Sequence, residues 1–163
     1  MVPSPAEPTS SGRTDRAALL LHADRRTVFA ALTDEAALLA WLPPRGMSGR
    51  FERFDMMTGG SYRLVLSYDD ATRSPGKSTA DSDVSEVRIV RIDDGDRIVQ
   101  EVDFESDDPA FGGTMRMEWR LSSEDGGTLV EIVARDVPDG VTARDHAEGI
   151  TSSLVNLAGY LEA

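Results

Sequence analysis

Alternating apolar and polar residues dominate the second half of the chain, and this period of two predicts β-strands. From 115 to 121 every second residue is large and apolar, and the residues between them are charged. One side of this strand is therefore expected to be buried, while Arg116 and Glu118 face solvent. A Gly-rich turn leads into a second alternating segment at 130–134, and two such segments joined by a turn indicate a β-hairpin.

Strands of the same kind are predicted towards the N-terminus, at 49–55, 61–68, 84–92 and 97–105. The last two are joined by Asp93-Asp94-Gly95-Asp96, and both Asp and Gly tolerate the positive φ angles of tight hairpin turns. Between the second and third of these strands lies the polar stretch 69–83, which contains Pro75-Gly76. This stretch is predicted to be a long mobile loop.

Helical spacing is found on both sides of the strand-rich region. Asp24 and Asp34 are predicted to cap two short helices, because their side chains can accept hydrogen bonds from the first free N–H groups. Pro43-Pro44 ends the second helix. An apolar run at 16–22 precedes both helices and is predicted to be a strand.

The C-terminal segment predicts one long helix. Thr142 and Asp145 resemble a capping box, and apolar residues then recur at spacings of three and four up to about residue 161. The stripe that is predicted to pack inward comprises Ala147, Ile150, Leu154, Leu157 and Leu161.

The order of elements predicts an α+β fold: one strand, two short helices, six strands and a long helix. Consecutive hairpins form an antiparallel sheet with one dry face, and only the last helix is long enough to cover it. Residues 1–15 are rich in Pro, Ser and Thr and are predicted to be a disordered tail. Residues 16–163 are predicted to be a single domain.

Composition narrows the class of partner. The net charge of −12 disfavours nucleic acid and anionic membranes, because such a surface repels phosphates. The sequence contains no cysteine, no apolar run long enough to span a bilayer and no signal-peptide core. We therefore expect a cytoplasmic protein without disulfides.

The candidate chemistry is sparse. The two histidines, His22 and His146, do not have the spacing of a metal site, and no serine lies in a nucleophile elbow. No phosphate-binding loop is present, since no lysine follows Gly59-Gly60. We expect no cofactor, no metal and no catalytic residue. His22 is expected to lie at the surface, whereas His146 in the first turn of the long helix could either hydrogen bond a ligand or face solvent.

The inward-facing positions of the strands are the best candidates for a ligand site, because Met adapts to varied shapes and Trp and Tyr combine apolar rings with a polar group. Gln100 shares a strand face with apolar neighbours, and a buried amide needs a partner, a water or a ligand. Plain core packing remains the alternative. The residues predicted to line a cavity are Tyr62, Leu64, Leu66, Gln100, Val102, Phe104, Met115, Met117, Trp119, His146 and Ile150.

Several short motifs in this order resemble one protein family. They are Val28–Asp34, Trp41, Asp55 followed by Gly59-Gly60-Ser61-Tyr62, Gly127–Val130 and His146–Leu161. Over residues 16–162 the chain resembles the activator of heat-shock-protein-90 ATPase homologue-like family of START-type helix-grip domains.

The resemblance implies a curved antiparallel sheet of six to seven strands around the long C-terminal helix, with an apolar cavity. It also implies that the loops 69–83 and 105–113 form a lid over that cavity. One departure is Ile150, which follows Gly149 where the family usually has an aromatic residue.

Three functional hypotheses follow from the resemblance and the residues. The first is a binding domain for a small apolar or amphipathic molecule. The second is an interaction module for a chaperone, by analogy with the activator. The third is a cyclase or hydratase in which His146 acts with Asp145, Tyr62 or Gln100 as acid–base partners. The chain is expected to be a monomer or a homodimer.

Overall fold

A computed structural model describes residues 13–69, 82–104 and 106–162. Most of the predicted tail at 1–15 and of the predicted loop at 69–83 lies outside these residues, as does Glu105 in the second predicted lid loop. The chain has the predicted α+β fold, and the residues in these ranges form seven strands and three α-helices.

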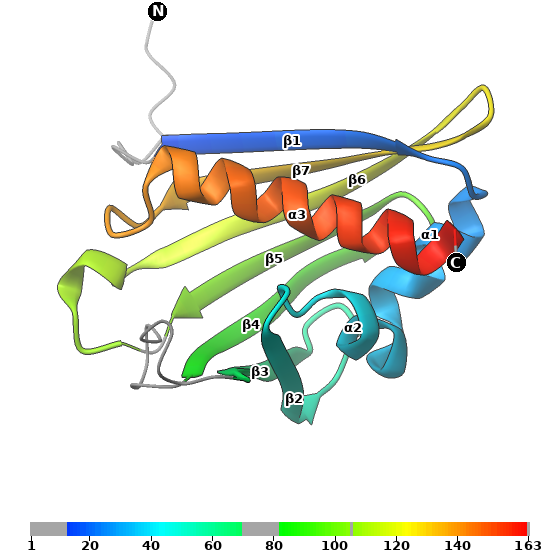
Figure 1. The fold of residues 1–163 in the computed structure, drawn as a ribbon. Coiled ribbons are helices and arrows are strands. Elements are labelled where there is room, and N and C mark those ends of the chain that lie inside the picture. The colour runs from blue at the N-terminus through cyan, green and yellow to red at the C-terminus, as the bar shows by residue number, and fades with distance from the viewer. Residues whose placement is uncertain (1–12, 70–81, 105, 163) are drawn as a thin grey trace, which may run out of the picture.

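The strands form one antiparallel sheet in the order β1-β7-β6-β5-β4-β3-β2 (Figure 1). Each strand pairs with a neighbour in the sequence except β1, which closes one edge against β7. The first strand begins at Arg13, three residues before the predicted start. The strands are β1 (Arg13–Leu21), β2 (Met47–Phe54), β3 (Ser61–Tyr68), β4 (Ser82–Asp93), β5 (Arg97–Phe104), β6 (Thr114–Glu124) and β7 (Gly127–Val137).

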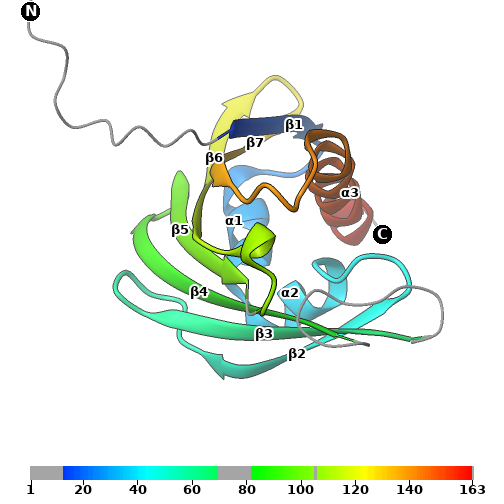
Figure 2. The same ribbon diagram turned by 90° about the vertical axis from the view of Figure 1, so that its left-hand side faces the viewer.

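The sheet curves, and the helices lie on its concave side (Figure 2). The long helix α3 runs beside β1, α1 contacts β6 and β7, and α2 contacts β2. Among the described helices, none is both long and apolar enough to cross a bilayer. The helices are α1 (Arg25–Thr33), α2 (Glu35–Trp41) and α3 (Ala143–Glu162), and a short 3₁₀ turn, η1, spans Pro109–Phe111.

The predicted helix caps are confirmed. The Asp24 side chain accepts a hydrogen bond from Thr27 N at 2.7 Å, and the Asp34 side chain accepts one from Ala37 N at 2.9 Å. At the start of α3, the Thr142 hydroxyl accepts from Asp145 N at 3.1 Å. Each cap satisfies a backbone N–H that the helix itself leaves without an acceptor.

One position of the predicted apolar stripe on α3 is wrong. Ile150, Leu154 and Leu157 are buried as expected, but Ala147 is exposed. The inward face continues from Ile150 back by four residues to His146, which hydrogen bonds to β1. Spacings of three and four are both compatible with one helix face, so the sequence pattern did not decide between His146 and Ala147.

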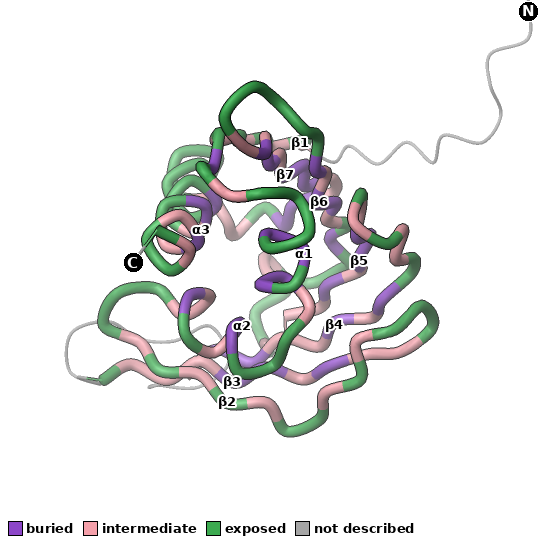
Figure 3. The backbone as a smooth tube through the Cα atoms, turned by 90° about the vertical axis from the view of Figure 1, so that its right-hand side faces the viewer, coloured by how far each residue is buried: buried purple, intermediate pink, exposed green. Residues whose placement is uncertain are grey.

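The core lies on the concave side of the sheet and has two clusters of buried residues (Figure 3). The first joins all three helices to β1, β6 and β7 and includes Trp41, Trp119 and Leu154. The second runs across the sheet from β3 to β7 and includes Tyr62 and Met115. Half-buried residues such as Met117 pack against both clusters and join them.

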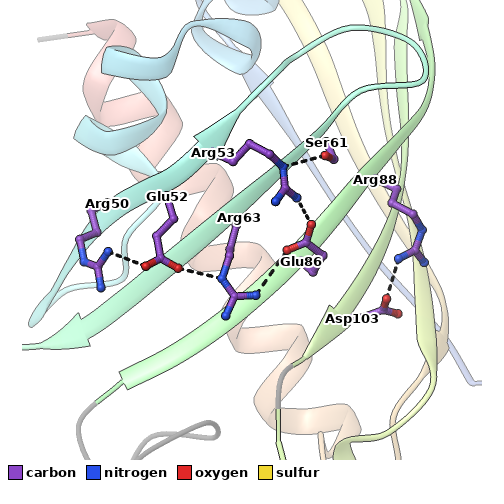
Figure 4. Close-up of polar contacts among 8 residues, drawn as sticks. All are labelled: Arg50, Glu52, Arg53, Ser61, Arg63, Glu86, Arg88 and Asp103. Carbon is purple, nitrogen blue, oxygen red and sulfur yellow. Dashed lines mark hydrogen bonds and ion pairs between the residues drawn. The ribbon is translucent and has the colours of Figure 1, made fainter.

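The outer face of the sheet carries ion pairs between strands. Glu52 accepts from Arg63 Nε at 2.7 Å, and Glu86 accepts from both Arg53 and Arg63 (Figure 4). Together with Arg50, these side chains join β2, β3 and β4 into one chain of alternating charge.

Glu118 lies on this outer face, as predicted, but it is not open to solvent. Arg97 and Arg120 each donate to its carboxylate at 3.0 Å and cover it, leaving the residue 9% exposed. Burial tends to raise the pKa of Glu118, but the two guanidinium groups outweigh it and lower that pKa. Strand periodicity predicted the side on which Glu118 lies but not the cover that neighbouring long side chains supply.

Candidate functional site

A small cavity lies between the short helices and the concave face of the sheet. Its volume is about 20 Å³, which is room for about one water molecule. Four of its nine lining residues carry polar groups, namely Trp41, Tyr62, Gln100 and Trp119. The other five are Leu32, Leu38, Leu42, Met56 and Ile98.

The strands supply the polar lining by simple alternation. Tyr62 is the second residue of β3, Gln100 lies in β5 and Trp119 in β6, and each side chain points inward with its apolar neighbours two residues away. The register sets Ile98 of β5 opposite Trp119 of β6. Both belong to the same cavity wall because paired residues lie on the same face.

Tyr62 and Gln100 form a buried polar pair. The Gln100 amide donates to the Tyr62 hydroxyl at 3.5 Å, and each residue is 6% exposed. Burial raises the pKa of Tyr62 to about 12, so the phenol is neutral at physiological pH. Within the part of the chain that the structure describes, no other protein group hydrogen bonds to either side chain. The Tyr62 hydroxyl hydrogen and Gln100 Oε1 therefore remain able to bind a further polar group.

The two tryptophans pack edge-to-face beside this pair, with ring centroids 5.8 Å apart and planes at 72°. Trp41 Nε1 donates to Ala31 O at 2.9 Å, which links α2 to α1. Trp119 Nε1 has no hydrogen-bond partner among the residues described. The lining thus combines aromatic surface with a few polar groups, as small-molecule sites usually do.

Part of the predicted site is in this lining and part is not. Tyr62, Gln100 and Trp119 line the cavity together. The remaining apolar candidates lie elsewhere in the core. Leu64, Val102 and Met115 are buried in the second cluster, Leu66, Phe104 and Met117 pack against it half-buried, and Ile150 is buried in the first cluster on α3.

Sequence reasoning missed the lining residues that come from the helices and from the turn between β2 and β3. Leu32, Leu38 and Trp41 are buried residues of α1 and α2, for which the sequence predicted two short capped helices and no part in a site. Met56 follows the end of β2, where periodicity no longer says which way a side chain points. The two predicted helices could have indicated these residues, because a cavity between a helix layer and a sheet is lined by side chains from both layers.

His146 lies in a different part of the molecule from the Tyr62–Gln100 pair. Its Nδ1 atom is 2.7 Å from Asp15 Oδ2, and Asp15 also binds Arg13. Burial tends to raise the pKa of Asp15, but the hydrogen bonds from Arg13 and His146 lower it below the usual range. Among the described residues, His146 forms no hydrogen bond with Tyr62 or Gln100, the partners that acid–base catalysis was expected to use.

Metal ligands are not gathered in the ranges that the structure covers: no group of three or more His, Asp or Glu side chains could hold an ion there. His22 is exposed, and its ring lies 3.3 Å from Gly126 O. The Tyr62–Gln100 cavity is therefore the candidate site.

A curved antiparallel sheet closed around one long helix, with a cavity on its concave side, defines a helix-grip domain. The chain belongs to the family described as Activator of Hsp90 ATPase homolog 1-like protein, whose family model matches residues 22–162. No curated protein matches the chain.

Solved structures resemble the chain over most of its length. A crystal structure of a protein from Chromobacterium violaceum has 26% sequence identity and a TM-score of 0.80, covering 92% of this chain and 97% of that chain. The AHSA1-like protein from Aeromonas hydrophila has 16% identity and a TM-score of 0.72, covering 92% of each chain.

A third similar structure is DynU16, a protein of the dynemicin biosynthetic locus. It has 20% identity and a TM-score of 0.67, covering 92% of this chain and 47% of that chain. This chain therefore spans about half the length of DynU16. At 16% and 20% identity, the similarity to the Aeromonas hydrophila protein and to DynU16 shows a shared fold only.

Proposed function

We propose that the chain is a binding domain for a small, uncharged, apolar or aromatic molecule held beside Tyr62 and Gln100. The buried polar pair within an aromatic lining supports this proposal. Core packing alone does not require a buried glutamine, because a polar group costs free energy when it is buried without full hydrogen bonding. A ligand with one hydrogen-bonding edge would use the capacity that Tyr62 and Gln100 leave open.

The absence of charge from the lining favours a neutral ligand. None of the nine residues around the cavity is charged, and the sequence has a net charge of −12. A carboxylate or phosphate in this position would be desolvated without a cation to compensate it. Fatty acids and nucleotides are therefore poor candidates, and neutral phenols, ketones and quinones are better ones.

The cavity has to widen before such a ligand can bind. A volume of about 20 Å³ holds roughly one water, whereas sites for organic ligands usually hold several hundred Å³. Lining side chains must move, and the stability gained on binding is reduced by the free energy of that movement. We therefore expect binding of moderate affinity.

A fluorescence titration tests the proposal, because both tryptophans of the sequence line the cavity. Neutral aromatic ketones and phenols, and fatty acids as the charged class, are titrated while Trp emission is followed. A neutral compound is expected to change the emission saturably. Tyr62→Phe is expected to weaken its binding by about 2- to 10-fold, which corresponds to one lost hydrogen bond.

Tyr160→Phe is the matched control, since it makes the same chemical change at a residue that is 43% exposed. It should leave the affinity unchanged. The proposal fails if no neutral compound changes the emission, or if the two Tyr→Phe variants weaken binding equally.

Binding to another protein is a second candidate function, favoured by one surface feature. Val155 and Tyr160 on α3 are 55% and 43% exposed and border a groove of about 410 Å³. Pro43 and Arg45 line its other side. Exposed apolar side chains around a groove suit a protein contact, and the family description refers to activation of a chaperone ATPase.

This second candidate is tested by adding the protein to a purified Hsp90-type chaperone and measuring ATP hydrolysis. Stimulation by the wild type that is lost in Val155→Asp would support it. Val90→Asp, at a residue 37% exposed on a strand, is the control. Absence of stimulation by the wild type would reject it.

A further inference from the structure

Two of the residues that line the cavity are less buried than the other seven. Seven of its nine lining residues are almost fully buried, at 6% exposure or less. Leu42 and Met56 are the two that are half-buried. These two side chains therefore separate the cavity from solvent, and a ligand that enters has to displace one of them.

Leu42 is held in place by its backbone. It is the C-cap of α2, and its N–H donates to Leu38 O at 2.8 Å. Pro43-Pro44 follows directly and restricts the backbone on the other side. The backbone of Leu42 is therefore fixed, and its branched side chain has only two rotatable bonds with which to move away from the cavity.

Met56 lies on a turn that is also fixed, at 55–60. Gly59 N donates to Ile89 O at 2.8 Å, and Ile89 N donates to Gly60 O at 2.9 Å, so the turn is bonded to β4 in both directions. The Thr58 hydroxyl accepts a further bond from Ile92 N at 2.9 Å. A hinged movement of the whole turn would break all three bonds.

Gly60 shows how closely this turn is packed. A Cβ atom at Gly60 would lie 2.3 Å from Asp55 O, so no other residue fits without moving the backbone. The side chain of Met56 is the mobile part, because methionine is unbranched and turns about three single bonds.

We infer that the Met56 side chain is the gate of the cavity: it rotates outward to admit a ligand while the turn that carries it stays in place. This inference rests on the proposed function, because it assigns the route by which a ligand reaches Tyr62 and Gln100. It places the entrance away from the loop 105–113, none of whose described residues lines the cavity.

Quenching of Trp fluorescence by acrylamide tests the gate without any ligand, since both tryptophans line the cavity behind Met56. Met56→Ala removes most of the gate and is expected to raise the quenching rate constant several-fold. Met56→Ile places a stiff β-branched side chain at the same point and is expected to lower it. The opposite direction of the two effects keeps the test valid if one variant folds poorly.

Met57→Ala is the control, because Met57 is the next residue along and is 57% exposed. It should leave quenching unchanged. The inference is overturned if Met56→Ala and Met57→Ala behave alike, or if Leu42→Ala raises quenching while Met56→Ala does not. The ligand titration tests the proposed function separately. If Met56→Ala raises the quenching rate constant but no neutral compound binds, the binding function is rejected while the role of Met56 as a gate is supported.

Discussion

His146 Nδ1 lies 2.7 Å from Asp15 Oδ2, and this contact joins the first turn of α3 to β1. Arg13 binds the same carboxylate through Nε at 3.0 Å and also donates to Val141 O in the loop before the helix. One carboxylate thus anchors the start of the long helix and the loop that leads into it. The side chains of Asp15 and His146 are 9% and 13% exposed, so the contact is largely shielded from solvent.

Replacing Asp15 should therefore destabilise the protein in a pH-dependent way. Its pKa is lowered in the folded state because hydrogen bonds from Arg13 and His146 outweigh the opposing effect of burial. The carboxylate stabilises the fold above its unfolded pKa of about 3.9, and this contribution is lost as the pH falls through the lower folded pKa. We expect Asp15→Asn to reduce the free energy of unfolding by about 1–3 kcal/mol at pH 7.

Urea denaturation between pH 7 and about pH 2 measures this difference, which should shrink as the wild-type carboxylate becomes protonated. Asp145→Asn is the control, because it also removes one carboxylate charge, at an exposed position in the helix turn that contains His146. It should cost about 0.3–1 kcal/mol through the helix dipole alone. Equal losses in the two variants would argue against the contact.

Replacing Gln100 tests whether its buried amide is needed for the stability of the fold. We expect Gln100→Met to change the free energy of unfolding by less than about 1 kcal/mol, because the gain from burying an apolar chain of similar size offsets the loss of the hydrogen bond that Gln100 donates to Tyr62. Chemical denaturation checks this, with Glu101→Met at the neighbouring outward position as the control. A loss of more than about 1 kcal/mol would mean that the amide has a structural role instead.

The outer-face ion pairs predict a salt-dependent effect at Glu86. This carboxylate binds Arg53 and Arg63 from two strands, and its side chain is 30% exposed (Figure 4). Glu86→Gln should lower the free energy of unfolding by about 0.5–1.5 kcal/mol at low salt. The loss should diminish at about 1 M salt, where the Debye length falls to roughly 3 Å.

Glu148→Gln is the comparison for this experiment. Its partner is Arg144 on the same helix. The side chain of Arg144 is 89% exposed and that of Glu148 is 70% exposed. Such a pair contributes about 0.3–0.5 kcal/mol. If both variants lose the same amount, the pairing across strands adds nothing.

Asp136 is a position where a substitution should stabilise the protein. Its backbone has φ 59°, and among the described residues its Oδ1 atom is buried without a hydrogen-bond partner. It lies in β7 where the pairing with β1 shifts register. Asp136→Gly removes both the strained conformation and the unpaired oxygen, so we expect a gain of about 1 kcal/mol.

Thermal or urea denaturation measures the gain. Asp139→Gly, at an exposed position two residues beyond the end of β7, should instead lose a few tenths of a kcal/mol through unfolded-state entropy. A loss in Asp136→Gly would indicate that the carboxylate serves the structure.

The sheet and the helix caps could be predicted because they depend on local chemistry. Alternation in β3 and β6 set which residues face inward, and Asp24 and Asp34 have the short acceptor side chains that a cap needs. The length of the last helix then indicated which element covers the dry face of the sheet, and the family resemblance implied that the sheet is curved. These signals do not depend on how the sheet bends.

The position of the cavity depends on that bend, which periodicity does not encode. Tyr62 and Phe104 both face inward, yet Tyr62 lies under the short helices and Phe104 does not line the cavity. His146 was recognised as a candidate, but its partner Asp15 was placed in the tail, because the strand was expected to begin after it. Contacts between residues so far apart in sequence leave no local pattern.

The pairing of β1 with β7 has a consequence for how the chain folds as it is synthesised. Leu21 is made early but pairs with Thr128, whereas every other strand meets a partner that is its neighbour in the sequence. The hairpins from β2 to β7 can form one after another on the ribosome. The edge formed by β1 has to wait for β7 to emerge, and closing so long a loop is entropically slow. The N-terminal strand should therefore be among the last parts of the protein to gain protection from hydrogen exchange during folding.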